Sequence, residues 1–322
     1  MLIAIYYKSK QFSLALIKIG LVVGAFYLIY NKLFLNSDFQ FNDLFHVLTN
    51  FSALSYKTVL FLVMLSISNW FFEILKWQNL VSSVRVISFK DAKEQSLGAL
   101  TASLLTPNRI GDYGAKAMYY TAPFRKKIML LNLLGNTVQM AITTIFGSLG
   151  LIYFSLHFEP NFNYKGIIIW FSIIGIISLI LVAFFRIKGF QKQKRLYGRL
   201  INFIKTISKK TILKTVGYSV LRYLIFSFQF YFLLTLFGVN LTYLEAMAAI
   251  SSMYLLSSII PSVFIFDVVI KGGIAVYIFG LLDISQTIVL AIVTLMWILN
   301  FVLPSIIGSY HVLQYKLPKS SV

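Results

Sequence analysis

The stretch LGALTASLLTPNRIGDYGAKAMYY, residues 97–120, interrupts an apolar segment at Pro107 and then places Asp112 four residues before Lys116. A second stretch, AMAAISSMYLLSSIIPSVFIFDVVIKGGIAVYIFG at residues 246–280, repeats this order of small residues, proline, acid and base. Its matching residues are Pro261, Asp267 and Lys271. Paired hydrophobic segments broken at matching places in the two halves of a membrane protein are the best sequence indication of a transporter's binding site.

The composition is that of an integral membrane protein. Of the 322 residues, 58% are apolar and only 12% are charged, whereas soluble domains are about half apolar and about a quarter charged. Uncharged runs such as residues 166–185 reach the roughly 20 residues that a helix needs to cross the hydrocarbon core. These runs are continuous and do not alternate, which indicates spanning helices and not the strands of a barrel.

The apolar pattern predicts about six spanning helices and two broken segments. Two N-terminal lysines precede the first apolar run and no small-residue cleavage site follows it, so we interpret that run as a retained helix. Pro304 is expected to kink the last helix. The predicted spans are 12–35, 58–80, 127–153, 166–185, 216–236 and 284–310, and the broken segments are 92–120 and 245–281.

Charge and length both favour broken segments that return to the side from which they start. A single crossing through residues 92–120 would place Arg85 and Lys90 opposite Arg125 and Lys126, against the positive-inside bias. Twelve helical residues from 109 to 120 also extend only about 18 Å, roughly half the hydrocarbon thickness. With two returning hairpins, both termini are cytoplasmic. The opposite side then keeps only Lys32, Lys57 and Lys165.

The predicted fold class is therefore all-α: a polytopic membrane protein with two re-entrant helical hairpins in an inverted repeat. The first hairpin enters from the cytoplasmic side and the second from outside. A hairpin tip must be buried in protein or line a wet cavity, because lipid cannot bond its free backbone groups. The single membrane domain comprises a first helix at 12–35, repeat unit one at 58–153, a linking helix at 166–185, a basic cytoplasmic loop at 186–214 and repeat unit two at 216–310.

The net charge of +19 is explained by membrane orientation and does not indicate nucleic-acid binding. The basic loop at 186–214 contains interleaved Leu, Ile and Phe, which fits either an amphipathic segment on an anionic leaflet or a solvated loop. Cysteine is absent and the three histidines are far apart, so we expect no metal site and no cofactor.

Three acids, Glu73, Asp112 and Asp267, lie well within apolar segments. An ionisable residue at membrane depth is a functional hypothesis by default. Lys116 and Lys271 follow the two aspartates at i+4, so each pair can share one helix face. Each pair either neutralises itself so that a polar helix can be buried, or contacts a charged substrate. Glu73 and Lys76 admit the same two interpretations.

Arg109 gives a sharper prediction at the first hairpin tip, because no acid stands at i−4 or i+4 and guanidinium binds phosphate oxygens bidentately. The half-helix that begins there also directs backbone donors towards the tip. The second tip has no arginine, so Lys271 or Arg222 would have to supply that charge. The predicted tip residues are Pro107, Asn108, Gly111, Pro261 and Ser262.

The phrase TPNRIGDYGAKAMYY and the span pattern resemble the transmembrane region of lysylphosphatidylglycerol synthases, a flippase-like family, over about residues 58–310. The first copy carries the core of the motif in Pro107, Arg109, Gly111 and Asp112, and the second copy matches by pattern only. The resemblance implies movement of aminoacylated phospholipids between leaflets. It also implies that synthesis belongs to a separate soluble domain, so no synthase activity is expected.

These observations predict a lipid flippase or related lipid transporter of the plasma (inner) membrane, acting on an anionic or aminoacylated phospholipid or a polyprenyl phosphate. No phosphate-binding Gly-rich loop, zinc-protease motif or aspartate cluster supports an enzyme. Two alternatives remain open: a small-solute or ion-coupled carrier, and a non-catalytic membrane partner of a cell-envelope lipid enzyme.

Overall fold

The computed structural model describes residues 55–104, 106, 110–157, 202–259 and 264–316, together with six positions between residues 16 and 27. For residues 264–270 it describes the backbone alone. Regular structure in these ranges is entirely helical. The helices are α3 (Tyr56–Val81), α4 (Phe89–Ser103), α5 (Gly111–Met118), α6 (Ala122–His157), α9 (Lys209–Leu236), α10 (Tyr243–Ile259), α11 (Phe264–Gly280), α12 (Gln286–Trp297), the π-helix η3 (Ile298–Val302) and α13 (Leu303–Gln314).

Four of these helical stretches are long and apolar enough to cross a membrane: Tyr56–Val81, Ala122–His157, Lys209–Leu236 and Gln286–Gln314. They correspond to four of the predicted spans. The other two, at 12–35 and 166–185, lie outside the described residues apart from the six positions noted above. An integral, polytopic helical membrane protein is therefore supported by sequence and structure together.

Each broken segment is a pair of helices that pack against each other. In the first, α4 ends at Ser103 and α5 begins at Gly111, and the two helices are in contact. In the second, α10 ends at Ile259 and α11 begins at Phe264, again with contact between the arms. The predicted tip residues Pro107, Asn108, Arg109, Pro261 and Ser262 lie outside the described residues.

Both helical pairs begin with the same local device, a capping box. At the start of α4, the Asp91 N–H donates to Ser88 Oγ at 3.1 Å, and the Ser88 N–H donates back to Asp91 Oδ2 at 3.2 Å. At the start of α10, the Glu245 N–H donates to Thr242 Oγ1 at 3.4 Å, and the Thr242 N–H and hydroxyl donate back to Glu245 Oε2 at 2.9 Å and 2.8 Å. These hydrogen bonds from Thr242 lower the pKa of the exposed Glu245 carboxyl. The resemblance of the two segments thus extends upstream to their first turns.

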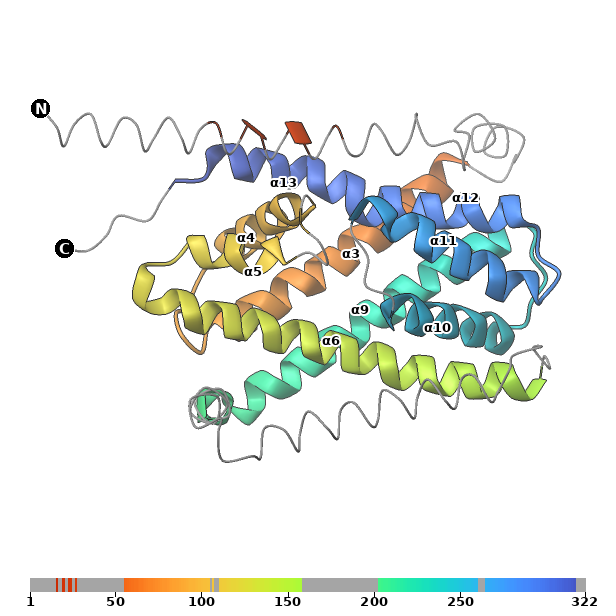
Figure 1. Ribbon diagram of the computed structural model, residues 1–322, viewed down its shortest axis with the longest axis horizontal. Coiled ribbons are helices and arrows are strands. Elements are labelled where there is room, and N and C mark those ends of the chain that lie inside the picture. Colours follow the sequence, from red (N-terminus) through yellow and green to blue (C-terminus); the bar gives the residue numbers. More distant parts are fainter. Residues whose placement is uncertain are drawn as a thin grey trace, which may run out of the picture.

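Helices from each half of the chain pack against helices from the other half. Helix α4 packs on α13 from the second half, and α10 packs on α6 from the first half, while α3 and α9 pack on each other. Figure 1 shows the α4–α5 pair towards one end of the long axis and the α10–α11 pair towards the other. The first helix of each pair is therefore covered by the last long helix of the opposite half.

Glycines allow both of these covering contacts to be close. A Cβ atom added at Gly308 of α13 would lie 2.1 Å from the carbonyl oxygen of Leu97 in α4. A Cβ atom added at Gly150 of α6 would lie 2.7 Å from the Cβ atom of Ser251 in α10. Both separations are shorter than van der Waals contact, so the close packing requires glycine, which has no Cβ atom, at these two positions.

The structure describes residues 202–214 of the basic segment 186–214. Helix α9 begins at Lys209, seven residues before the predicted span, because Ser208 caps it by accepting from the Thr211 N–H at 3.1 Å. The preceding Ile207 is only 5% exposed and packs with Phe203 and Ile212 against the apolar cluster of α3 and α6. Ile207 is thus covered by protein, whereas Ile204 is 38% exposed and Leu213 is 73% exposed, so both interpretations of the segment stay predictions.

Candidate functional site

A cavity of about 480 Å³ lies between the two halves of the molecule. Its walls come from α3, α4, α5, α6, α9, α10, α11 and η3, which are contributed by both halves of the chain. The volume falls within the range of about 300–1,000 Å³ that is typical of small-molecule pockets. Charged residues in its walls are Glu73, Lys76, Asp112, Lys116, Arg222 and Lys271.

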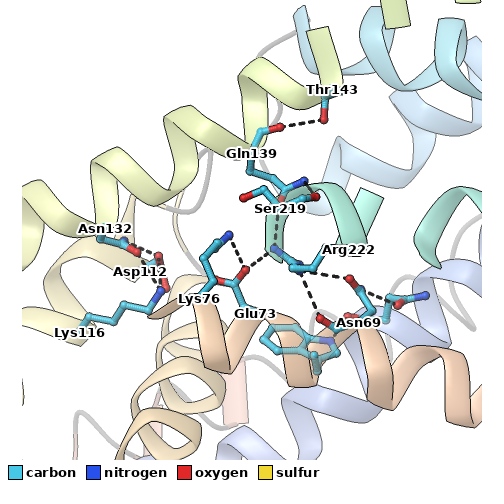
Figure 2. A network of polar contacts seen from close by, with 12 residues as sticks. Asn69, Glu73, Lys76, Asp112, Lys116, Asn132, Gln139, Thr143, Ser219 and Arg222 are labelled. Carbon is cyan, nitrogen blue, oxygen red and sulfur yellow. Dashed lines mark hydrogen bonds and ion pairs between the residues drawn. The ribbon is translucent and has the colours of Figure 1, made fainter. Parts of the chain in front are cut away.

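One charged cluster in the cavity joins α3 to α9. Asn69, Glu73 and Lys76 recur at i, i+4 and i+7, which places them on one face of α3. Glu73 Oε2 pairs with Lys76 Nζ at 2.7 Å and also accepts from Arg222 Nη1. Arg222 Nε donates to the Asn69 side-chain oxygen at 3.2 Å, and Arg222 Nη1 donates to Gln139 Oε1 of α6 at 3.3 Å. Figure 2 shows Glu73 between its two cations.

A second charged cluster joins α5 to α6. Lys116 is only 3% exposed, and its Nζ atom lies 3.3 Å from Asp112 Oδ2 and 2.9 Å from Asn132 Oδ1. The Asn132 amide donates to the same Asp112 oxygen, so the three side chains form a closed triangle (Figure 2). Lys116 Nζ also lies 4.6 Å from the ring centre of Trp77 in α3, in cation–π geometry. These contacts hold Asp112 and Lys116, the acid and base of the α4–α5 pair, at the wall of the cavity.

Uncharged amides extend the network across the interface of the two halves. Asn69 donates to Asn300 Oδ1 at 3.1 Å, and Asn300 donates to Gln229 Oε1 of α9 at 2.8 Å. Asn300 lies in η3, where the altered helical hydrogen bonding makes backbone carbonyls accessible. The Asn300 carbonyl accepts from Trp70 Nε1 at 3.0 Å, and the neighbouring Leu299 carbonyl accepts from Ser66 Oγ. The π-helix therefore anchors α3.

The structure places the predicted site residues as follows. Glu73, Asp112, Lys116, Arg222 and Lys271 all line the one cavity, although they come from four helices. Gly111 starts α5, and its N–H donates to Thr106 Oγ1 at 2.8 Å. Asp267 lies on α11, where the side chain is not described, and Lys271 Nζ lies 5.8 Å from the ring centre of Phe301. Arg109 lies outside the described residues, so its contact with a substrate stays a prediction.

The sequence reasoning missed the amides that complete the network, although a sequence signal for them exists. Asn132, Asn136, Gln139 and Thr143 recur at i, i+4, i+7 and i+11 along α6, so they form one polar stripe on an apolar helix. All four lie at the cavity or bond to a residue that lines it. Reading polar periodicity within the apolar runs would have identified them.

One family comparison bears on this architecture. The family model described as the lysylphosphatidylglycerol synthase transmembrane region matches residues 15–308. This confirms the resemblance drawn from the first hairpin motif and extends it to the residues before unit one. No curated protein matches the chain. The match covers all the described helices up to the middle of α13, so the chain belongs to the family of lysylphosphatidylglycerol synthase transmembrane regions.

Proposed function

We propose that this protein is a lipid flippase-like transporter that moves a phospholipid with a charged headgroup between leaflets of the plasma membrane. The observation that carries the proposal is the cavity between the two halves, which is lined by four cations and two carboxylates among the described side chains. Charged groups this deep in a helical membrane protein mark substrate pathways. Membership of a family named for lipid synthesis at the membrane supports the lipid as substrate.

The proposed topology is an inverted repeat in which α4–α5 and α10–α11 are re-entrant hairpins. Three observations support it: each pair packs arm on arm, each begins with a capping box, and the first arm of each is covered by the last helix of the opposite half. The second arm of the first pair is also too short to cross a membrane, since α5 has 8 residues and would extend only about 12 Å. The positive-inside bias then places both termini in the cytoplasm.

In the proposed mechanism the headgroup enters the cavity while the acyl chains remain in the bilayer. The charged walls replace the water that a headgroup loses on leaving the interface, which is the main cost of moving it. The lipid crosses chemically unchanged. An enzyme that synthesises or consumes the lipid is the class of partner that such a transporter would serve.

The test is leaflet exchange in liposomes that contain the purified full chain. Phosphatidylglycerol and phosphatidylethanolamine labelled on an acyl chain, and polyprenyl phosphate labelled on its prenyl chain, are each incorporated. A membrane-impermeant reductant then bleaches the outer-leaflet label. We expect bleaching to exceed that of protein-free liposomes for at least one lipid, and Arg222→Ala to remove the excess. Thr144→Ala is the matched control, because Thr144 is exposed on α6 and bonds only within its own helix. Bleaching equal to protein-free liposomes for all three lipids would contradict the proposal.

A further inference from the structure

The charges in the cavity wall do not balance. Glu73 faces two cations, Lys76 and Arg222, whereas Asp112 faces Lys116 alone. Even with Lys271 set aside, three cations therefore face two carboxylates among the described lining residues. The excess cannot be relieved by solvent at Lys76, which is 2% exposed. A buried excess charge is costly unless a counter-charge approaches it.

Two hydroxyl groups at the same cavity have no hydrogen-bond partner among the residues that the structure describes. They are Ser96 Oγ on α4 and Tyr254 OH on α10. Ser96 is only 3% exposed, so bulk water does not satisfy it. Each hydroxyl can donate one hydrogen bond to an acceptor in the cavity. The two come from different hairpins, so an acceptor with more than one oxygen suits them.

We propose that the cavity binds a lipid phosphodiester whose headgroup carries a net charge of −1, as in phosphatidylglycerol, in preference to zwitterionic or aminoacylated headgroups. This inference rests on the proposed function, because it names the substrate class of the same cavity. The phosphodiester supplies one negative charge for the excess cation and two acceptor oxygens for Ser96 and Tyr254. Every phospholipid has that group, so selectivity comes from what else the headgroup carries. An added ammonium group meets a wall that is already cationic and is repelled.

Binding to the detergent-solubilised full chain tests the charge preference. The shift of the thermal unfolding midpoint is titrated with dioctanoyl phosphatidylglycerol, dioctanoyl phosphatidylethanolamine, dioctanoyl lysylphosphatidylglycerol and inorganic phosphate. We expect phosphatidylglycerol to bind most tightly, lysylphosphatidylglycerol to bind least tightly of the three lipids, and inorganic phosphate to bind more weakly than phosphatidylglycerol. Equal or tighter binding of lysylphosphatidylglycerol overturns the charge preference. Phosphate that binds as tightly as phosphatidylglycerol overturns the assignment to a lipid.

Variants test the residues named. Ser96→Ala and Tyr254→Phe should each weaken the affinity for dioctanoyl phosphatidylglycerol about tenfold, as expected for a hydrogen bond to a charged group. Ser257→Ala is the matched control, because Ser257 is also buried and without a partner among the described residues but does not line the cavity. Lys76→Gln removes the excess charge and should narrow the difference between phosphatidylglycerol and lysylphosphatidylglycerol. Wild-type binding by both hydroxyl variants overturns the inference.

The outcomes separate this inference from the proposed transport. The expected order of binding without any leaflet exchange would support the anion site and contradict the flippase function. Leaflet exchange together with the opposite order of binding would support the flippase function and contradict the anion site.

Discussion

The two hairpins share a sequence pattern but differ in what surrounds them. The α4–α5 hairpin lines the cavity with Ser96, Leu100, Ser103, Asp112, Tyr113 and Lys116, whereas the described side chains of α10–α11 contribute Tyr254 and Lys271. Most buried residues of the second hairpin belong instead to the largest apolar cluster, as Ala249, Met253 and Phe279 do. The duplicated phrase therefore specifies a broken helix pair, the turn upstream of it supplies the cap, and neighbouring helices decide whether the pair forms a charged wall or an apolar core.

The largest expected effect lies where the two halves meet. Glu73→Gln would leave Lys76 and Arg222 close together without their shared carboxylate, and removing one partner of a buried ion pair costs about 3–5 kcal/mol. We expect a markedly lower thermal unfolding midpoint in detergent and loss of leaflet exchange. The double variant Glu73→Gln with Lys76→Met removes one excess cation and should recover part of the midpoint. If the single variant Glu73→Gln is as stable as wild type, the ion pairs of Glu73 with Lys76 and Arg222 do not stabilise the fold.

The next effect compares how each hairpin is covered. Gly308→Ala sets a methyl group against the Leu97 carbonyl oxygen, and Gly150→Ala sets one against the Ala248 carbonyl oxygen at 2.9 Å. Overpacking typically costs about 1–3 kcal/mol, and the closer contact at Gly308 should cost more. Thermal unfolding of purified protein gives the order. Gly217→Ala in α9 is the control, since nothing lies within 4 Å of the added Cβ atom. If Gly217→Ala lowers the unfolding midpoint as much as Gly308→Ala does, the packing explanation is wrong.

A third effect concerns function and should separate the two hairpins. Lys116→Gln removes a side chain that bonds to both Asp112 and Asn132, so we expect at least about a tenfold loss of leaflet exchange. Lys271→Gln should lower exchange by a smaller factor, because the second hairpin contributes less of the described cavity wall. Initial bleaching rates in liposomes with matched protein content measure both. Equal losses would mean that the hairpins contribute equally to the path.

The smallest effect is expected at the cap of the second hairpin. Thr242 lowers the pKa of Glu245, so the carboxylate stabilises the folded state above the ordinary carboxyl pKa, and this contribution is lost as pH falls through the lowered value. Glu245→Gln should therefore lower the unfolding midpoint slightly at pH 7. The difference from wild type should vanish at a pH below the lowered pKa. A difference that persists unchanged in acid would exclude the carboxylate as its cause.

Much of the fold followed from the sequence because membrane helices are constrained by length and apolar content. The four described spans and both breaks lie where the apolar runs predicted them, and the start of α9 was missed because its first turns are basic. Glu73, Asp112 and Arg222 were identifiable because charge is rare in apolar segments. Asn69, Gln229 and Asn300 were not, because an amide in an apolar helix is common and only tertiary contact shows its partners.

The π-helix between α12 and α13 has a further consequence for the geometry of the second half. A π turn holds about one residue more than an α turn, so the residues beyond it are turned by roughly 100° relative to the same residues in a regular α-helix. Upstream of η3, α12 packs on α11, and downstream α13 presents Gly308 to α4. The π-helix thus changes the direction in which the residues of α13 face, within the one helical stretch that contacts α11 before it and α4 after it. If Ile298–Val302 formed regular α turns with every residue kept, Gly308 would be turned away from the hairpin that it accommodates.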